Sequence, residues 1–109
     1  MATFFRNEVI KDIGALPVKI LETSGSQRAT VIGLSLTNLT DKFVYVSVLL
    51  KDDTSVTGYY LKDTVLPANA SLRVVSTGEK LILAPTNELY VQSSLADSVD
   101  VVCSYVEIT

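Results

Sequence analysis

The chain has 109 residues, a length typical of one domain, and with 48% apolar and 19% charged residues it is too hydrophobic for the disordered class. Its net charge is −3 and its nine lysine and arginine residues are scattered, which argues against binding to nucleic acid phosphates or to an anionic membrane surface. We therefore expect one folded domain, residues 1–109, with no nucleic-acid partner and no membrane partner.

The first 22 residues are compatible with two interpretations. Phe5, Val9 and Ile13 are spaced at i, i+4 and i+8, so they would share one face of a helix. Alternatively, the segment forms two strands joined by a turn at Gly14-Ala15. We favour this hairpin because every later segment has a strand pattern and a hairpin adds no new layer to the fold.

The amino-terminal end has two further features. Arg6 and Glu8 stand where a secretory signal would be continuously apolar, so we expect no signal peptide. Residues 1–8 also carry the adjacent side chains Phe4 and Phe5. On the strand interpretation, this segment is a candidate amino-terminal arm that would add itself to the open sheet edge of a neighbour.

Two strands are predicted in the middle of the chain. Residues 28–38 place an apolar side chain at every second position from Ile32 to Leu36, the pattern of a half-buried strand. Residues 42–51 are apolar at nearly every position, which predicts a strand covered on both faces, or covered on its second face by a partner chain. The short polar segment 39–41 between them predicts a hairpin turn.

Further strands follow at residues 55–64, 71–75, 80–84, 89–92 and 99–108, with a turn predicted at Thr77-Gly78. The phrases Leu66–Leu72 and Leu83–Leu89 resemble each other in sequence, and each contains a proline that breaks the strand pattern. We expect them to be equivalent corners at which the chain passes from one sheet to another.

The spacing of the turns indicates the fold class. Turn signals recur about every 8 to 12 residues, which is typical of an antiparallel two-sheet sandwich. No helical segment is secure, and an alternating pattern of strands and helices is absent. The sequence therefore predicts an all-β sandwich of about eight strands, either jelly-roll or immunoglobulin-like.

The composition gives little support for a catalytic nucleophile or a metal site. The chain has no histidine, so a Ser-His-Asp or Cys-His arrangement and the commonest metal sites cannot be built from it. Its one cysteine, Cys103, has Val101 and Tyr105 on the same strand face, which predicts a buried, inert thiol. We expect no catalytic residue, no cofactor and no metal site, and hence a protein that is not an enzyme.

Two acidic clusters are candidate ligand or acid–base sites. Asp52-Asp53 and the pair Asp97 and Asp100 would offer carboxylate oxygens to calcium, but neither has the spacing of a known calcium loop. Solvated turns are the better interpretation of both. An enzyme that uses Asp52 and Asp53 as an acid pair is the least supported of the functional hypotheses.

Adjacent aromatic residues provide the candidate interface. In the strand at 55–64, strict alternation would place Tyr59 with Leu61 and Asp63 on one face, and Tyr60 on the other, so one of the two tyrosines would point outward. An outward tyrosine is either an interface anchor or a sheet-surface residue paired across strands. Together with the amino-terminal pair, the candidate interface residues are Phe4, Phe5, Tyr59 and Tyr60.

From Thr30 onward, the phrases TVIGLSLTN, YYLKDTVLPANASL, EKLILAPTNELYVQSS and SVDVVCSYVEI resemble those of small β-sandwich virion proteins of tailed bacteriophages, including marine and cyanobacterial phages. The resemblance covers most of the chain, and the matched positions are largely strand and turn residues. It implies a protein assembled in the host cytoplasm into the virion, as capsid decoration or as a neck or tail component. Its implied partners are copies of itself and other virion proteins.

Two functional hypotheses therefore lead. The first is a structural virion protein that forms homo-oligomers and acts by protein–protein contact. The alternative is a carbohydrate-binding module in which Tyr59 or Tyr60 serves as a stacking platform, although the chain lacks tryptophan, the strongest such platform.

Overall fold

The computed structural model describes residues 2–76 and 78–109, and these residues form strands joined by turns, with no helix. The all-β prediction is confirmed. No helix suited to crossing a membrane occurs in this part of the chain. The predicted turn at 77–78 includes Thr77, which lies outside the described residues. The nine strands are β1 (Thr3–Ile13), β2 (Val18–Glu22), β3 (Arg28–Asn38), β4 (Val44–Lys51), β5 (Thr57–Leu66), β6 (Ser71–Val75), β7 (Leu81–Leu83), β8 (Glu88–Ser93) and β9 (Val99–Ile108).

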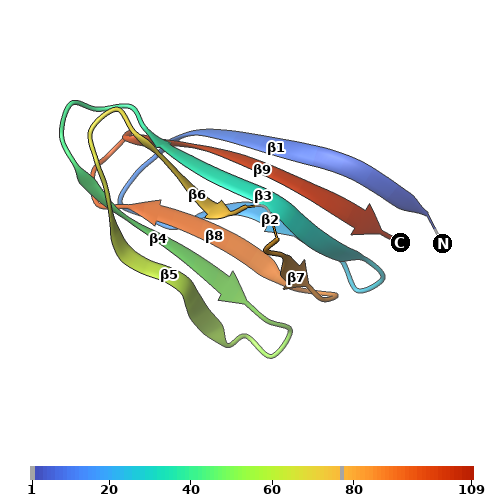
Figure 1. Ribbon diagram of the computed structural model, residues 1–109. Helices are drawn as coiled ribbons and strands as arrows, with labels where there is room; N and C mark the ends of the chain where they lie inside the picture. The colour runs from blue at the N-terminus through green and yellow to red at the C-terminus, as the bar shows by residue number, and fades with distance from the viewer. Residues whose placement is uncertain (1, 77) are drawn as a thin grey trace.

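The strands form two antiparallel sheets that face each other as a sandwich (Figure 1). The first sheet has the order β1-β9-β3-β6, and the short strand β7 also pairs with β3. The second sheet has the order β2-β8-β4-β5. The predicted two-sheet sandwich is therefore confirmed.

The order of pairing decides between the two expected sandwich types. Strand β4 pairs with its successor β5, while β3 pairs with β6, β2 with β8 and β1 with β9. The four pairs are nested, so that the outermost pair joins the two ends of the chain. With β7 set aside, this arrangement is the eight-stranded double Greek key of a jelly roll.

Two predicted hairpins are wrong, although the strands on either side of them are correct. Residues 39–41 join β3 in the first sheet to β4 in the second, and the turn at Gly14-Ala15 likewise joins β1 to β2 in the opposite sheet. Both connections are corners between layers. A short polar segment serves either purpose, because the partner of each strand is set by contacts with distant parts of the chain.

The two similar proline-containing phrases are indeed corners. One joins β5 in the second sheet to β6 in the first, and the other joins β7 in the first sheet to β8 in the second. Each contains a residue in the left-handed region of backbone conformation, Asn69 with φ of 54° and Thr86 with φ of 65°. The shared sequence pattern thus corresponds to a shared structural role.

Asn38 ties two of these corners together. It ends β3 with 1% of its surface exposed. Its Nδ2 lies 2.8, 3.1 and 3.1 Å from the backbone oxygens of Lys42, Leu66 and Pro67, to which it donates, and its Oδ1 accepts from the backbone N–H and the hydroxyl of Thr40 at 2.9 and 2.8 Å. One side chain therefore satisfies backbone groups on both the β3–β4 and the β5–β6 connections.

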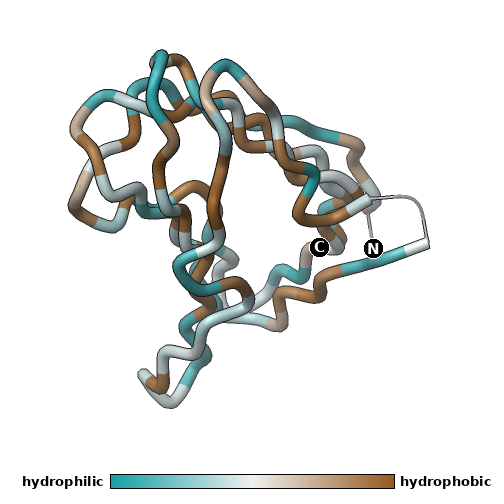
Figure 2. The backbone as a smooth tube through the Cα atoms, turned by 60° about the vertical axis from the view of Figure 1, so that its left-hand side comes forward, coloured by the Kyte–Doolittle hydropathy of each residue, from teal (hydrophilic) through white to brown (hydrophobic). Residues whose placement is uncertain are grey.

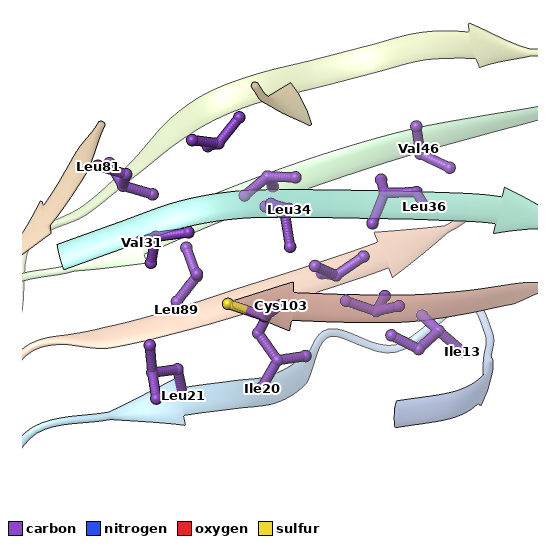
Figure 3. Close-up of a cluster of buried hydrophobic side chains, with 14 of the residues drawn as sticks. Ile13, Ile20, Leu21, Val31, Leu34, Leu36, Val46, Leu81, Leu89 and Cys103 are labelled. Atoms are coloured by element: carbon purple, nitrogen blue, oxygen red, sulfur yellow. The ribbon is translucent and has the colours of Figure 1, made fainter. Parts of the chain in front are cut away.

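The core fills the space between the sheets with aliphatic side chains from both layers (Figure 3). In Figure 2, hydrophobic and hydrophilic residues alternate along much of the backbone, as expected for strands with one buried face. The fully buried aliphatic side chains include Ile13, Val31, Leu34, Leu36, Val46, Leu83, Leu89 and Val101.

Residues 3–8 of the candidate amino-terminal arm belong to the first sheet. They form the first half of β1, and each of them from Thr3 to Glu8 is paired in register with β9 of the same chain. The segment is therefore not a free arm in this structure, because the long strand β9 provides it with a partner. It lies at the edge of the first sheet, where its other side has no neighbouring strand among the described residues.

Candidate interaction surfaces

The outer face of the second sheet carries a group of exposed aromatic and aliphatic side chains, which we call the tyrosine face: Phe43, Tyr45, Tyr59 and Val65. Tyr45 is 43% exposed although its neighbours Val44 and Val46 are buried, so its ring points away from the core. Tyr45 lies opposite Val65 in the β4–β5 ladder, and its ring meets that of Phe43 edge to face at 5.6 Å between centroids. These contacts join Phe43, Tyr45 and Val65 into one apolar cluster on the tyrosine face.

Strand β4, predicted to be covered on both faces, is covered on one face within this chain. Val44, Val46 and Val48 are buried against the first sheet, whereas Tyr45 contributes to the tyrosine face. Coverage of that second face by a partner chain stays a prediction.

A hollow of about 350 Å³ interrupts the tyrosine face. Tyr45 and Tyr59 lie on its rim, and polar side chains line it, among them Ser47, Asp63 and Gln92. The Ser47 hydroxyl accepts a hydrogen bond from the Asp63 backbone N–H at 3.0 Å. The hollow therefore combines aromatic faces with hydrogen-bonding groups, the combination that sugar-binding sites use.

The structure places both Tyr59 and Tyr60 at the surface, with 54% and 39% of their areas exposed. Strict alternation fails in β5 because its register against β4 shifts twice. One shift lies between Val46 and Val48 of β4, and the other lies between Val48 and Leu49. As a result Leu61 faces the buried Val48, and it does not share a face with Tyr59 as predicted.

The two tyrosines have different surroundings. Tyr59 lies opposite Leu49 on the tyrosine face, and the Lys62 ammonium sits 5.1 Å from its ring centroid. Tyr60 donates a hydrogen bond to Glu79 at 3.3 Å, and burial followed by the charge of Glu79 raises the pKa of Tyr60. Tyr59 is therefore the stronger candidate for an interface anchor.

The outer face of the first sheet has its own apolar side chains, which we call the valine face: Phe5, Val9, Ile32, Ile82 and Val102. Val9 and Val102 lie opposite each other in the β1–β9 ladder and are 60% and 45% exposed. Phe5 is 79% exposed and lies opposite Val106 on the same face. The sandwich thus presents large apolar side chains on both of its outer faces.

Phe4 and Phe5 point to opposite faces of β1. Phe4 lies on the side that carries Arg6, whose guanidinium carbon is 4.9 Å from the centroid of its ring. Arg6 also forms an ion pair with Glu107 at 3.4 Å. The two phenylalanines therefore belong to different surfaces, and the structure does not bring them together with Tyr59 and Tyr60, which lie on the other sheet.

The Asp52-Asp53 cluster holds a turn, as predicted, whereas in the second pair Asp97 lies in a turn and Asp100 lies in β9. Oδ1 of Asp52 accepts hydrogen bonds from the hydroxyl and N–H of Thr54 and from the N–H of Val56, at 2.7 to 3.0 Å, and these bonds lower the pKa of Asp52. Asp100 accepts the N–H of Asp12 at 3.1 Å, which supports the positive φ of 57° at that residue. No cluster of three metal-ligating side chains occurs within residues 2–76 and 78–109.

Cys103 is buried in the core, as the sequence predicts (Figure 3). Burial, with a smaller contribution from the negative charge of Glu8, raises its pKa to about 12. An unfolded cysteine loses its proton near pH 8.5. The folded state therefore keeps the Cys103 proton to a higher pH than the unfolded state does. The contribution of this thiol to the free energy of unfolding is complete below about pH 8.5 and is lost as the pH rises toward 12.

We expect iodoacetamide at pH 8 to leave Cys103 unmodified in the folded protein and to modify it fully in denaturant. The folded thiol is inaccessible, and at this pH it is protonated, so it lacks the thiolate that reacts. Intact-mass spectrometry measures the modified fraction over time. Rapid modification in native buffer, at a rate close to that in denaturant, would contradict the buried placement.

Several surface residues were missed by the sequence interpretation, among them Phe43, Tyr45 and Val9. Phe43 and Tyr45 stand in the nearly continuous apolar run at 42–51, where alternation cannot be seen because both faces carry apolar residues. The signal that would have found Tyr45 is its position between two valines, since adjacent strand residues face opposite ways.

Comparison with known proteins supports the fold. No family model matches the chain, and no curated protein sequence matches it. Among solved structures, it is similar to a protein of the Bacillus endospore appendages, which are described as disulfide-linked pili. That match has a TM-score of 0.58 and 12% sequence identity, and it covers 98% of this chain and 88% of the other.

The chain is also similar to part of a protein from the infectious bursal disease virus, Gt strain. The TM-score is 0.50 and the identity 7%, with 97% of this chain covered. The chain spans only 32% of the length of that viral protein. At these identities the two similarities establish a shared β-sandwich fold.

Proposed function

We propose that this chain is a structural, non-enzymatic subunit that acts by protein–protein contact with copies of itself and with other proteins of a particle. The observation that carries the proposal is the exposure of large apolar side chains on both outer faces, the tyrosine face and the valine face. Surfaces of this kind mark sites of association in proteins that are otherwise well packed.

The setting that we propose is the virion of a tailed bacteriophage, as capsid decoration or as a neck or tail component. The resemblance of the strand and corner phrases to virion proteins of such phages supports it. The jelly-roll order of the strands supports the broader role, because this fold is common in viral capsid proteins. The similar structures come from an appendage and from a virus, both of which are assemblies of proteins.

Light scattering and negative-stain microscopy of the purified chain test the proposal. We expect particles whose mass is a multiple of 11.8 kDa, with cyclic or otherwise closed symmetry. Tyr59→Ala should raise the concentration needed for half-assembly about tenfold, because it removes an exposed aromatic anchor. Tyr60→Ala is the matched control and should have a smaller effect, since that side chain is engaged with Glu79. A chain that stays monomeric at all concentrations would overturn the proposal.

The hollow between Tyr45 and Tyr59 favours carbohydrate binding as the second candidate function. A module of this kind would stay monomeric and would be retained on a glycan column or array. Tyr45→Ala should then abolish retention, and Tyr60→Ala should leave it unchanged because Tyr60 does not line the hollow. Retention of a monomer with this pattern of variants would replace the first proposal by the second.

A further inference from the structure

Strand β1 exposes one complete edge of the first sheet. Among the described strands its only neighbour in the sheet is β9 (Figure 1), and the pairing of the two strands keeps one register from Thr3 to Ile10. Ala2 and Thr109 exchange both of their backbone hydrogen bonds, at 3.2 and 2.9 Å. Hydrogen-bonded and non-hydrogen-bonded pairs alternate along an antiparallel ladder, so this exchange fixes which backbone groups of β1 turn toward β9.

The outward-facing groups follow from that alternation. Phe4, Arg6, Glu8 and Ile10 fall on hydrogen-bonded pairs with β9. The residues between them therefore turn their N–H and C=O groups toward the open edge: Thr3, Phe5, Asn7 and Val9. A further strand would find an unused row of donors and acceptors there.

The edge lacks three of the features that usually prevent such pairing. From Thr3 to Ile10 the strand contains no proline, no lysine and no bulge, and the irregularity in its ladder with β9 comes only after Ile10. Its outward-facing backbone groups belong in part to Phe5 and Val9, whose side chains are among the most exposed apolar side chains on the described surface. An additional strand would cover both of them.

The sequence of this strand is complementary to itself. Around Asn7, the residues 4–10 read Phe-Phe-Arg-Asn-Glu-Val-Ile, with two apolar residues at each end and opposite charges on either side of the centre. In an antiparallel pair of two copies with a twofold axis at Asn7, Arg6 faces Glu8 of the second copy. Each of the apolar residues faces an apolar residue of the second copy in the same way, Phe5 against Val9 and Phe4 against Ile10.

Other registers are less favourable. Two other registers of the β1 pair keep the same hydrogen-bonding pattern. A pair centred on Arg6 places two arginines opposite each other, and a pair centred on Glu8 places two glutamates opposite each other. Glu8 forms no ion pair within residues 2–76 and 78–109, and the side chain of Arg6 stays 48% exposed despite its contact with Glu107. Both charges are thus available to a second copy.

We propose that β1 pairs with β1 of a second copy of this chain, antiparallel and centred on Asn7, so that the first sheets of the two copies form one continuous sheet. This inference rests on the proposed function, assembly with copies of itself, and names the surface that mediates one contact. Asn7 and the flanking residues Phe5 and Val9 would supply the backbone hydrogen bonds. The two Arg6–Glu8 contacts would set the register.

Charge exchange between two variants tests the pairing. Glu8→Arg places two positive charges opposite each other in each contact, and Arg6→Glu places two negative charges opposite each other, so each variant alone should dimerise at least about tenfold more weakly than the wild type. Mixed together, the two variants restore opposite charges at both contacts and should form the mixed dimer. Native mass spectrometry resolves it by mass, and Lys42→Glu controls for the change in net charge.

Disulfide capture provides a second readout, which does not depend on charge. Across a twofold axis at Asn7, the two Cα atoms at this position would be about 5.5 Å apart, within the range for a disulfide. Asn7→Cys should therefore form a covalent dimer on mild oxidation. Phe5→Cys, the matched control, should not, because the two positions would lie more than about 10 Å apart. Cys103 is buried and should not compete.

The outcomes separate this inference from the proposed function. If the wild type assembles but the charge variants behave like it and Asn7→Cys yields no covalent dimer, the β1 pairing is wrong and assembly uses another surface. If the wild type is monomeric at every concentration, the proposed function fails together with the inference. Selective formation of the mixed dimer, with capture at Asn7 and not at Phe5, is the result that we expect.

Discussion

Asn38→Ala should lower the free energy of unfolding by about 3 kcal/mol. The substitution removes a buried amide that donates to backbone oxygens on two connections and accepts from the N–H and the hydroxyl of Thr40. Alanine offers no replacement, and the space left beside these backbone groups is screened from solvent. Urea denaturation followed by fluorescence or circular dichroism measures the change.

The loss of stability should come from the contacts of Asn38 with the two connections, and other residues at the end of β3 should not cause it. Thr37, the preceding residue, uses its hydroxyl only in an exposed contact with Ser71 at 2.9 Å. Thr37→Ala should therefore lower the free energy of unfolding by less than about 1 kcal/mol. Equal losses in the two variants would show that Asn38 does not hold the β3–β4 and β5–β6 connections together.

Leu36→Ala should lower the free energy of unfolding by a comparable amount, about 3 to 4 kcal/mol. Leu36 is fully buried on β3, a strand flanked by partners on both sides in the first sheet, and its side chain points into the layer between the sheets (Figure 3). Alanine leaves a cavity because the regular strands around it cannot collapse without breaking their ladders. Thermal and urea unfolding both measure this change.

The chain offers a matched control for this variant. Leu16 lies on the corner between β1 and β2 with 80% of its surface exposed. Leu16→Ala is chemically the same substitution, yet it should alter the unfolding free energy by no more than about 0.5 kcal/mol. If Leu16→Ala lowered the free energy of unfolding as much as Leu36→Ala does, the layer between the sheets would not be the main source of stability.

The strands were predictable from sequence, and their partners were not. Alternation and turn residues are local, so β3, β6 and β9 have the predicted bounds. Pairing depends on contacts between distant segments, and the turn residues at 39–41 and Gly14-Ala15 suit a hairpin as well as a corner. The two corners that were predicted correctly are those with a proline and a residue that adopts positive φ, Asn69 and Thr86.

The candidate surfaces were predictable only in part. Alternation predicts that one of Tyr59 and Tyr60 points outward, but both are exposed, and the separation of Tyr59 from Leu61 depends on register shifts between β4 and β5 that no composition signal marks. The buried state of Cys103 follows from its apolar neighbours on one strand face. The tyrosine face could not be assembled from sequence, because Tyr45 and Val65 become neighbours only when β4 and β5 pair in the observed register.

The nested order of the strands also bears on how the chain reaches this structure. Among the described strands, only β4 and β5 pair across a short turn, whereas β1 and β9 come from the two ends of the chain. The chain entropy lost on closing a contact grows with the length of the loop, so the outermost pair is the most costly to form from the unfolded state. A topology of this kind folds slowly, and β1 is expected to join the sheet late, after the inner pairs provide the strand against which it docks.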